Sequence, residues 1–321
     1  MSASPIADWE RHRKTVAVTV ILAALLYFGV AVYSGWQEVW SAAVRIGAGG
    51  LLLALALSLT NYGVRSYRWS RYLTALGHPL QWRINLNIYL AGFALTTTPG
   101  KSGELVRSLL LKQHGVRYST SVAAFVAERA NDLMALLALM FIGTFSHPNA
   151  WIVSLVTLAL ISVLFIILRQ PKTVDAFHRA FEKRGWKWLT KQAQAGVKVA
   201  NDFRLCTQGN TLWLSLLLGV LAWGTESTGF YLIAHFAGNA DLSLGWGEAV
   251  FIYTFATLVG ALSLLPAGVG SAEVTMLGLL IASGSGYGEA VAITVIARMA
   301  TLWFGVSIGI IALARQIKTG K

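Results

Sequence analysis

Apolar residues fill long stretches of this chain, and the length of these stretches matches the thickness of a membrane. About 20 residues of helix, at about 1.5 Å per residue, cross the roughly 30 Å of hydrocarbon in a bilayer. Stretches of sufficient length occur at residues 15–33, 46–64, 118–144, 150–168, 211–236 and 287–313. The pattern therefore predicts an all-α polytopic membrane protein with about six full spans.

Two further apolar stretches, at residues 84–98 and 247–265, end in Pro/Gly-rich turns and then continue as short apolar helices. The breaks fall at Pro99, Gly100 and Gly103 in the first stretch and at Pro266, Gly268 and Gly270 in the second. Irregular backbone at membrane depth is tolerated where it is buried in protein or lines a wet cavity. The two patterns therefore predict re-entrant hairpins at residues 84–113 and 247–283.

Composition and charge narrow the class of protein. Hydrophobic residues make up 55% of the chain and charged residues 12%, about half the roughly 25% of soluble domains. The net charge is +12, and Lys and Arg concentrate in segments that fall on one side if both termini are cytoplasmic. These segments contain Arg65, Arg68, Arg71, Arg83, Lys112, Arg117, the basic stretch 169–204, Arg315, Lys318 and Lys321. This distribution excludes a nucleic-acid partner and favours attraction to anionic lipid headgroups on the cytoplasmic face.

The spans and charges divide the chain into five parts. We expect a cytoplasmic N-terminus at 1–14, a first membrane half at 15–168, a basic amphipathic linker at 169–210, a second membrane half at 211–313 and a cytoplasmic tail at 314–321. The linker is either a helix at the membrane interface or a solvated connection between the halves. A homo-oligomer is left open.

The two halves contain an internal repeat at an offset of 169 residues. Between residues 102 and 133, eleven of thirty-two positions are identical to their partners, including Glu104 with Glu273 and Arg129 with Arg298. The charge distribution places the two hairpins on opposite sides, so the copies have inverted topology. Inverted repeats with broken helices indicate a transport site near the membrane midplane. A duplication retained only for packing is the alternative.

Charged residues inside the membrane cost about 2.5–3.5 kcal/mol each and need partners or a wet cavity. Glu128 and Asp132 share one helical face, and the half-helices that start at Ser102 and Ser271 present free N–H groups, with these serines as N-caps. We expect the hairpin tips to hold an anionic group such as a lipid phosphate. The predicted substrate-binding residues are Lys101, Ser102, Glu104, Arg107, Glu128, Arg129, Asp132, Glu226, Ser271, Glu273 and Arg298.

Several roles stay open for the carboxylates. Glu104 and Glu273 either pair with arginines to fix the hairpins, bind a cationic headgroup or take up a proton. Glu226 either lines the cavity or bonds a neighbouring helix. The histidines lack metal-ligand spacing and Cys206 is the single cysteine, so no metal, disulfide or cofactor is expected.

Two segments resemble a two-part pattern of the membrane domain of lysylphosphatidylglycerol synthases. The first part, P-G-x-x-G-E-x-x-R, is matched by Pro99-Gly100-Lys101-Ser102-Gly103-Glu104-Leu105-Val106-Arg107, and the second, E-R-x-x-D, by Glu128-Arg129-Ala130-Asn131-Asp132. The segment from Pro266 to Glu273 resembles that family's second motif, and Arg68-Trp69 resembles its basic-aromatic pair. The resemblance implies a stand-alone, flippase-like lipid-handling protein without the soluble aminoacyl-transferase domain.

Together these observations favour an inner-membrane translocase for a phosphate-headed lipid, either a phospholipid or a polyprenyl phosphate. One alternative is a membrane enzyme that acts on a lipid-linked substrate, with Glu104, Asp132 or Glu273 as acid or base; no catalytic constellation is readable for it. The other is a carrier for small solutes or ions, which would have a cavity closed to lipid on all sides.

Overall fold

The described part of the protein is built from helices alone. The computed structural model describes residues 35–97, 102–143, 187–238, 244–263 and 265–319, with isolated positions at 29 and within 152–170. The predicted span 15–33 and most of 150–168 lie outside the described residues. The first half contains α2 (Trp36–Ala75), α3 (Trp82–Ala91), the 3-10 turn η1 (Gly92–Leu95), α4 (Ser102–Lys112) and α5 (Tyr118–Gly143).

After α8 (Lys187–Cys206), the second half contains α9 (Gly209–Ala237), α10 (Trp246–Leu262), the short turn η4 (Pro266–Gly268) and α11 (Ser271–Ala282). It ends with α12 (Tyr287–Arg298), a π-helical turn η5 (Met299–Trp303) and α13 (Phe304–Thr319). Three helical segments of the described part are long and apolar enough to cross a membrane, namely Trp36–Ala75, Gly209–Ala237 and Tyr287–Gln316. The prediction of an all-α membrane protein is confirmed.

Helix α2 extends beyond the span predicted for it at both ends. It is kinked at Gly47, whose φ of 67° lies in the left-handed region that glycine tolerates. The helix continues beyond residue 64, where the apolar run ends, to Ala75. Arg65 and Arg68, predicted as charges of a cytoplasmic segment, are buried within the protein instead.

The packing of α2 against α9 forms the centre of the molecule. The amide of Asn61 donates to the carbonyl of Ala222 at 2.8 Å, and Nε of Arg45 donates to the carbonyl of Ala237 at 2.8 Å. These two bonds show that α2 and α9 run antiparallel, since the earlier residue of α2 meets the later residue of α9. Helices α5, α10 and α12 pack around this pair.

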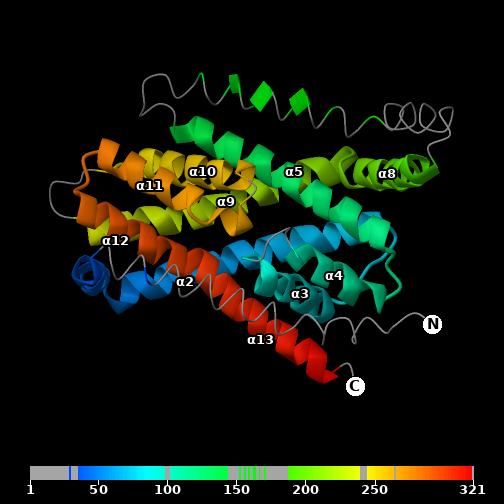
Figure 1. Ribbon diagram of the computed structural model, residues 1–321, viewed down its shortest axis with the longest axis horizontal. Coiled ribbons are helices and arrows are strands. Elements are labelled where there is room, and N and C mark those ends of the chain that lie inside the picture. Colours follow the sequence, from blue (N-terminus) through cyan, green and yellow to red (C-terminus); the bar gives the residue numbers. More distant parts are fainter. Residues whose placement is uncertain are drawn as a thin grey trace.

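The two predicted hairpins occupy opposite ends of the molecule (Figure 1). In the first, α3 and η1 pack against α4; in the second, α10 packs against α11. The helices after the breaks begin at Ser102 and Ser271, and the next helices begin at Tyr118 and Tyr287, so both starts are separated by the offset of 169 residues. The helix bounds therefore follow the sequence repeat.

The long helices that follow the hairpins run in opposite directions. Helix α5 begins beside α4 and reaches α10, whereas α12 begins beside α11 and its continuation α13 packs on α3 and η1 (Figure 1). Gly309 is the point of closest approach of α13 to η1, because a Cβ there would overlap the backbone nitrogen of Ala94. Each long helix thus links one hairpin to the opposite half.

Helix α8, the described part of the predicted linker, is docked on the helical core. It packs along α5, and the hydroxyl of Thr120 donates to Asp202 at 2.9 Å. Phe203 and Cys206 are buried in an apolar cluster with Trp69 and other residues of α2 and α3. The C-terminal part of this segment is therefore a packed amphipathic helix rather than a solvated connection.

Candidate functional site

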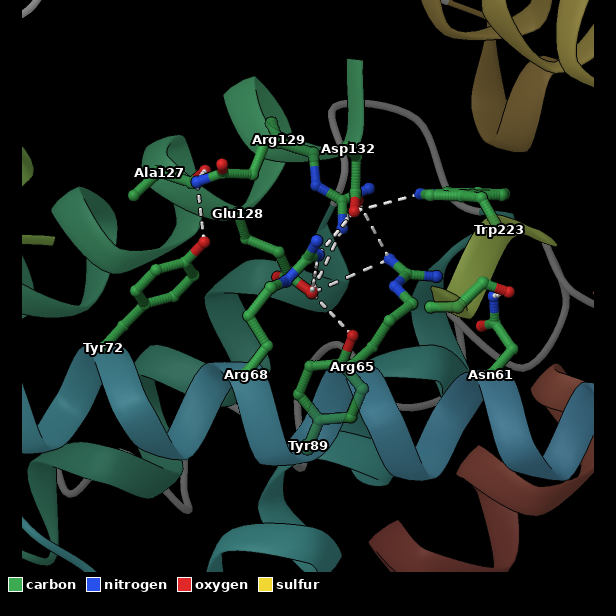
Figure 2. Close-up of polar contacts among 12 residues, drawn as sticks. Asn61, Arg65, Arg68, Tyr72, Tyr89, Ala127, Glu128, Arg129, Asp132 and Trp223 are labelled. Atoms are coloured by element: carbon green, nitrogen blue, oxygen red, sulfur yellow. Dashed lines mark hydrogen bonds and ion pairs between the residues drawn. The ribbon is translucent and has the colours of Figure 1, made fainter. Parts of the chain in front are cut away.

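Four arginines and two carboxylates meet inside the first half of the molecule. Helix α2 contributes Arg65 and Arg68, and α5 contributes Glu128, Arg129 and Asp132 (Figure 2). Helix α4 contributes Arg107. A spacing of three residues places Arg65 and Arg68 on one face of α2, and a spacing of four places Glu128 and Asp132 on one face of α5. Because α2 and α5 pack against each other, the two faces meet.

Asp132 is the most heavily bonded carboxylate of this cluster. It accepts hydrogen bonds from Arg68, from Nη2 of Arg65 at 3.3 Å and from Nε1 of Trp223 at 3.1 Å, and Nη2 of Arg129 lies 2.9 Å from it. Four donors from α2, α5 and α9 thus converge on one carboxyl group. Such pairing is what allows charges to persist at this depth.

Glu128 binds a second set of partners. Nη1 of Arg107 donates to it at 2.9 Å and the hydroxyl of Tyr89 donates at 2.6 Å. The guanidinium of Arg107 also lies over the ring of Trp69, 4.6 Å from its centroid, in a cation–π contact. Arg65 and Arg129 lie 3.7 and 3.4 Å from Glu128. Glu128 therefore ties α3, α4 and α5 together.

The second hairpin has its own ion pair. Nε of Arg298 donates to Oε1 of Glu273 at 2.6 Å, and Nη2 of Arg298 donates to the carbonyl of Ala267 at 3.1 Å. The other oxygen of Glu273 accepts the backbone N–H of Gly270 at 2.7 Å. Of the roles left open for Glu273, this geometry favours the pairing that fixes the hairpin.

One prediction for this hairpin tip is wrong. The N-cap of α11 is Gly270 and not Ser271, whose hydroxyl donates instead to Ser263 and Gly268. The carboxylate of Glu273 lies at the positive end of α11, where it accepts the N–H of Gly270. Gly268 allows the hairpin to close, since a Cβ there would lie 2.7 Å from the Cα of Gly260.

A cavity of about 280 Å³ lies between the two halves. Its walls come from both hairpins and from the long helices, and its polar lining includes Arg65, Arg107, Arg129, Asp132, Glu226 and Arg298. Trp223, at the middle of α9 (Gly209–Ala237), also lines it. The cavity thus lies at mid-length of a helix long enough to cross a membrane. Leu262 and Leu265 form part of its edge and are exposed on the surface.

The structure brings together about half of the predicted site residues. Arg107, Arg129, Asp132, Glu226 and Arg298 line the cavity. Glu128 and Glu273 are paired with arginines that line it. Pro99, Gly100 and Lys101 lie outside the described residues, as do the side chains of Ser102 and Glu104. Among the described residues, no group of three His, Cys, Asp or Glu has the arrangement of a metal site.

The predicted substrate-binding residues do not include four residues of the site, Arg65, Arg68, Tyr89 and Trp223, although Arg68 belongs to the basic-aromatic pair noted in the sequence. The three-residue spacing of the two arginines at the end of an apolar run was the available signal for them, because it places both on the helical face that meets α5. No local pattern identified Tyr89 or Trp223, because these side chains donate hydrogen bonds to carboxylates of α5, which is distant from both in sequence.

The fold and the cavity define an all-helical membrane protein with a buried, arginine-rich site between two oppositely directed halves. Residues 16–309 match the family described as the lysylphosphatidylglycerol synthase TM region, and the chain belongs to this family. The resemblance predicted from the sequence motifs is therefore confirmed.

Similar proteins extend over most of their own length and most of this chain. A UPF0104 membrane protein of Methanothermobacter thermautotrophicus is 26% identical over 308 residues, which cover 90% of each chain. UPF0104 membrane proteins of Archaeoglobus fulgidus and Pyrococcus horikoshii are 24% and 20% identical, and they cover 81% and 94% of this chain and 84% and 96% of their own. These relatives support the assignment to a membrane protein family.

Proposed function

We propose that this protein is a translocase that moves a phosphate-headed lipid between the leaflets of the membrane. The observation that supports this most directly is the combination of guanidinium groups inside the cavity with exposed leucines at its edge. A pocket with guanidinium groups inside and exposed leucines at its edge suits an amphiphile whose headgroup enters while its chains stay in the bilayer. A carrier for small solutes would not need an edge open to hydrocarbon.

The arginines of the cavity offer donors to a phosphate group. Arginine is suited to phosphate because its planar group donates in a fixed fork. Arg129 has a side-chain exposure of 33%, against 9% for Arg65, so we expect an entering phosphate to contact Arg129 first.

The size of the cavity limits what can enter it. A volume of about 280 Å³ is just below the roughly 300–1,000 Å³ of small-molecule sites. It accommodates a compact headgroup but not two acyl chains. The chains of the lipid would then lie along the exposed face beside Leu262 and Leu265, which keeps them in contact with hydrocarbon.

Exposed aromatic residues at both ends support a transmembrane orientation. The end with α3 and α4 has Trp82, Tyr118 and Trp213, and the end with α10 and α11 has Trp36, Trp40, Trp246 and Tyr287. Tryptophan and tyrosine are enriched at membrane interfaces. The helix between Trp213 and Phe236 is about 35 Å long at about 1.5 Å per residue, which fits the distance between two such interfaces.

This orientation leads to the topology that we propose for the whole chain. The hairpins enter the membrane from opposite faces, both termini are cytoplasmic, and the chain crosses the inner membrane several times. Paired broken helices whose breaks meet near mid-depth are typical of inverted-repeat transporters. Thr96, near the first break, and Gly268, at the second, line the same cavity. A shared cavity is what we expect if the two breaks meet near mid-depth.

The proposal is tested in vesicles reconstituted with the full chain. The probes are fluorescent phosphatidylglycerol, a fluorescent polyprenyl phosphate and a fluorescent diacylglycerol without phosphate, and the measurement is the rate at which each becomes accessible to an external quencher. We expect the protein to accelerate one of the two phosphate lipids and not the diacylglycerol. A rate equal to that of protein-free vesicles for both phosphate lipids contradicts the proposal.

Matched arginine variants test the site itself. Arg129→Gln removes a cavity arginine, whereas Arg71→Gln removes an exposed arginine of α2 that lies outside the cavity. We expect the first to lower the rate about tenfold or more, since loss of a charge-assisted hydrogen bond is worth about 1.5–3 kcal/mol, and the second to leave it unchanged. Equal rates for the two variants would exclude Arg129 from the site. Uptake of free glycerol phosphate into the vesicles would instead indicate a small-solute carrier.

A further inference from the structure

Glu226 is a buried carboxyl group that the ion-pair cluster does not use. It lies near the middle of α9, is 7% exposed and lines the cavity. Its Oε2 atom is buried and has no hydrogen-bond partner among the described residues. A buried carboxylate without a full set of partners is costly, so this group needs either a ligand or a proton.

The groups around Glu226 come from both halves of the molecule. Arg65 on α2 and Arg298 on α12 are bonded to the carboxylates of Asp132 and Glu273, respectively. Tyr253 contacts Glu226 from α10. The charged and titratable groups that face it from the elements packed against α9 are Tyr62, Arg65, Asp132, Tyr253 and Arg298.

The charge of Glu226 depends on what fills the cavity. Burial disfavours the charged carboxylate, and in a cavity without an anion the positive field of Arg65 and Arg298 opposes this effect. When a phosphate enters the same cavity, its negative charge offsets the positive field of these arginines and also repels a second negative charge nearby. Like charges at close range favour the protonated form of a carboxyl group. Entry of a phosphate therefore favours binding of a proton to Glu226.

We propose that Glu226 is a proton-binding site that couples a proton to the phosphate-headed lipid. A proton from the aqueous side binds the carboxylate to form the neutral acid as the phosphate enters, and it leaves when the phosphate leaves. No other bond forms or breaks. The headgroup and the proton thus move in the same direction, and a transmembrane pH gradient drives the lipid. This inference rests on the proposed function.

The sign and size of the pH effect follow from linkage. If phosphate binding is accompanied by uptake of one proton, the apparent affinity for the lipid rises as the pH falls, by about tenfold per pH unit over the range where free Glu226 is ionised. Glu226→Gln imitates the neutral acid and removes this dependence. Glu226→Asp keeps a titratable carboxyl group and therefore retains the pH dependence.

The experiment measures proton uptake directly. The full chain in detergent and weak buffer is titrated with short-chain phosphatidylglycerol, while a pH dye reports the protons taken up per lipid bound. We expect about one proton per lipid for the wild type and for the control Glu38→Gln, which changes an exposed carboxylate at the start of α2. We expect none for Glu226→Gln, whatever its affinity for the lipid.

The outcomes separate this inference from the proposed function. Binding of phosphatidylglycerol without proton uptake by the wild type overturns the inference even if the protein moves lipids, and this measurement requires no variant. Proton uptake that persists in Glu226→Gln also overturns it. In vesicles, a pH gradient should accumulate the lipid through the wild type and should not do so through Glu226→Gln. Absence of both binding and movement of phosphate lipids in the wild type would reject the proposed function and the inference together.

Discussion

Replacing Asp132 by asparagine tests whether the buried ion-pair cluster holds the first half of the protein together. Asp132 pairs with Arg65, Arg68 and Arg129 and accepts the indole N–H of Trp223. The asparagine side chain keeps the size of the original and one oxygen acceptor but removes the negative charge. Glu128 is then the carboxylate that remains among the described cluster residues.

The expected loss of folding stability follows from the burial of Arg68. Its side chain has 0% exposure, and its distance to Glu128 is 3.8 Å, too long for a hydrogen bond. Removing one partner of a buried pair costs about 3–5 kcal/mol because the other charge stays buried without compensation. Because asparagine retains one acceptor, we expect Asp132→Asn to lower the free energy of unfolding by about 3 kcal/mol, the lower value of this range. At about 2 °C per kcal/mol for a large domain, Tm should fall by about 6 °C.

The chain contains a built-in reporter for this measurement. Cys206 is its single cysteine and is fully buried beside Phe203 and Trp69. Burial raises the pKa of this thiol, so reactive thiolate is scarce in the folded protein. A maleimide dye that fluoresces on reaction with thiols should therefore stay dark in the native protein at neutral pH and brighten as heating exposes Cys206.

A double variant separates charge from packing. Arg68→Met removes the buried cation, and replacing a buried pair by apolar groups of similar volume is often close to neutral. The double variant Asp132→Asn/Arg68→Met should therefore have a higher Tm than Asp132→Asn alone. If Asp132→Asn unfolds within about 2 °C of the wild type, or if the two changes are simply additive, the cluster does not stabilise the fold in the way argued.

Three further changes can be followed with the same thiol assay. Gly309→Ala should lower the Tm by several degrees, because its methyl group overlaps the backbone of Ala94 and overpacking costs about 1–3 kcal/mol; an unchanged Tm would contradict the close approach of α13 and η1. Glu273→Gln should destabilise less than Asp132→Asn, since the side chain is 16% exposed and its amide oxygen still caps α11. Tyr62→Phe should cost about 1 kcal/mol, because the hydroxyl of Tyr62 satisfies the carbonyl of Thr301 in the π-helical turn; no change in Tm would show that the turn needs no external donor.

Much of the architecture follows from signals that are local in sequence. Pro266 and its neighbouring glycines end one helix and start another because proline lacks an N–H and glycine adopts positive φ. The four-residue spacing of Glu128 and Asp132 places them on one face wherever α5 packs. The repeat offset predicted the start of α11 from that of α4, since duplicated sequence tends to repeat its local geometry.

The partners of the buried charges could not be predicted in this way. An arginine at the end of an apolar run, such as Arg68, either reaches water at the interface or turns inward to a carboxylate. The choice depends on α5, whose Asp132 is 64 residues away in sequence. Likewise, serine is a better N-cap than glycine by local preference, yet the strained turn at Gly270 and the reach of Glu273 decide the cap of α11.

The two copies of the repeat have corresponding helix starts but different charged residues. At the offset of 169 residues, Arg107, Glu128 and Asp132 correspond to Met276, Ala297 and Thr301, whereas Arg129 corresponds to Arg298. The arginines common to both copies line the cavity from opposite halves, while the cluster that immobilises its neighbours exists only in the first copy. Under the proposed function, each half would present one arginine to the same headgroup. The first half is braced by buried ion pairs, and the second by the single pair of Arg298 with Glu273 among the described residues. If the protein moves lipids as proposed, we therefore expect the second hairpin to be the part that moves during transport.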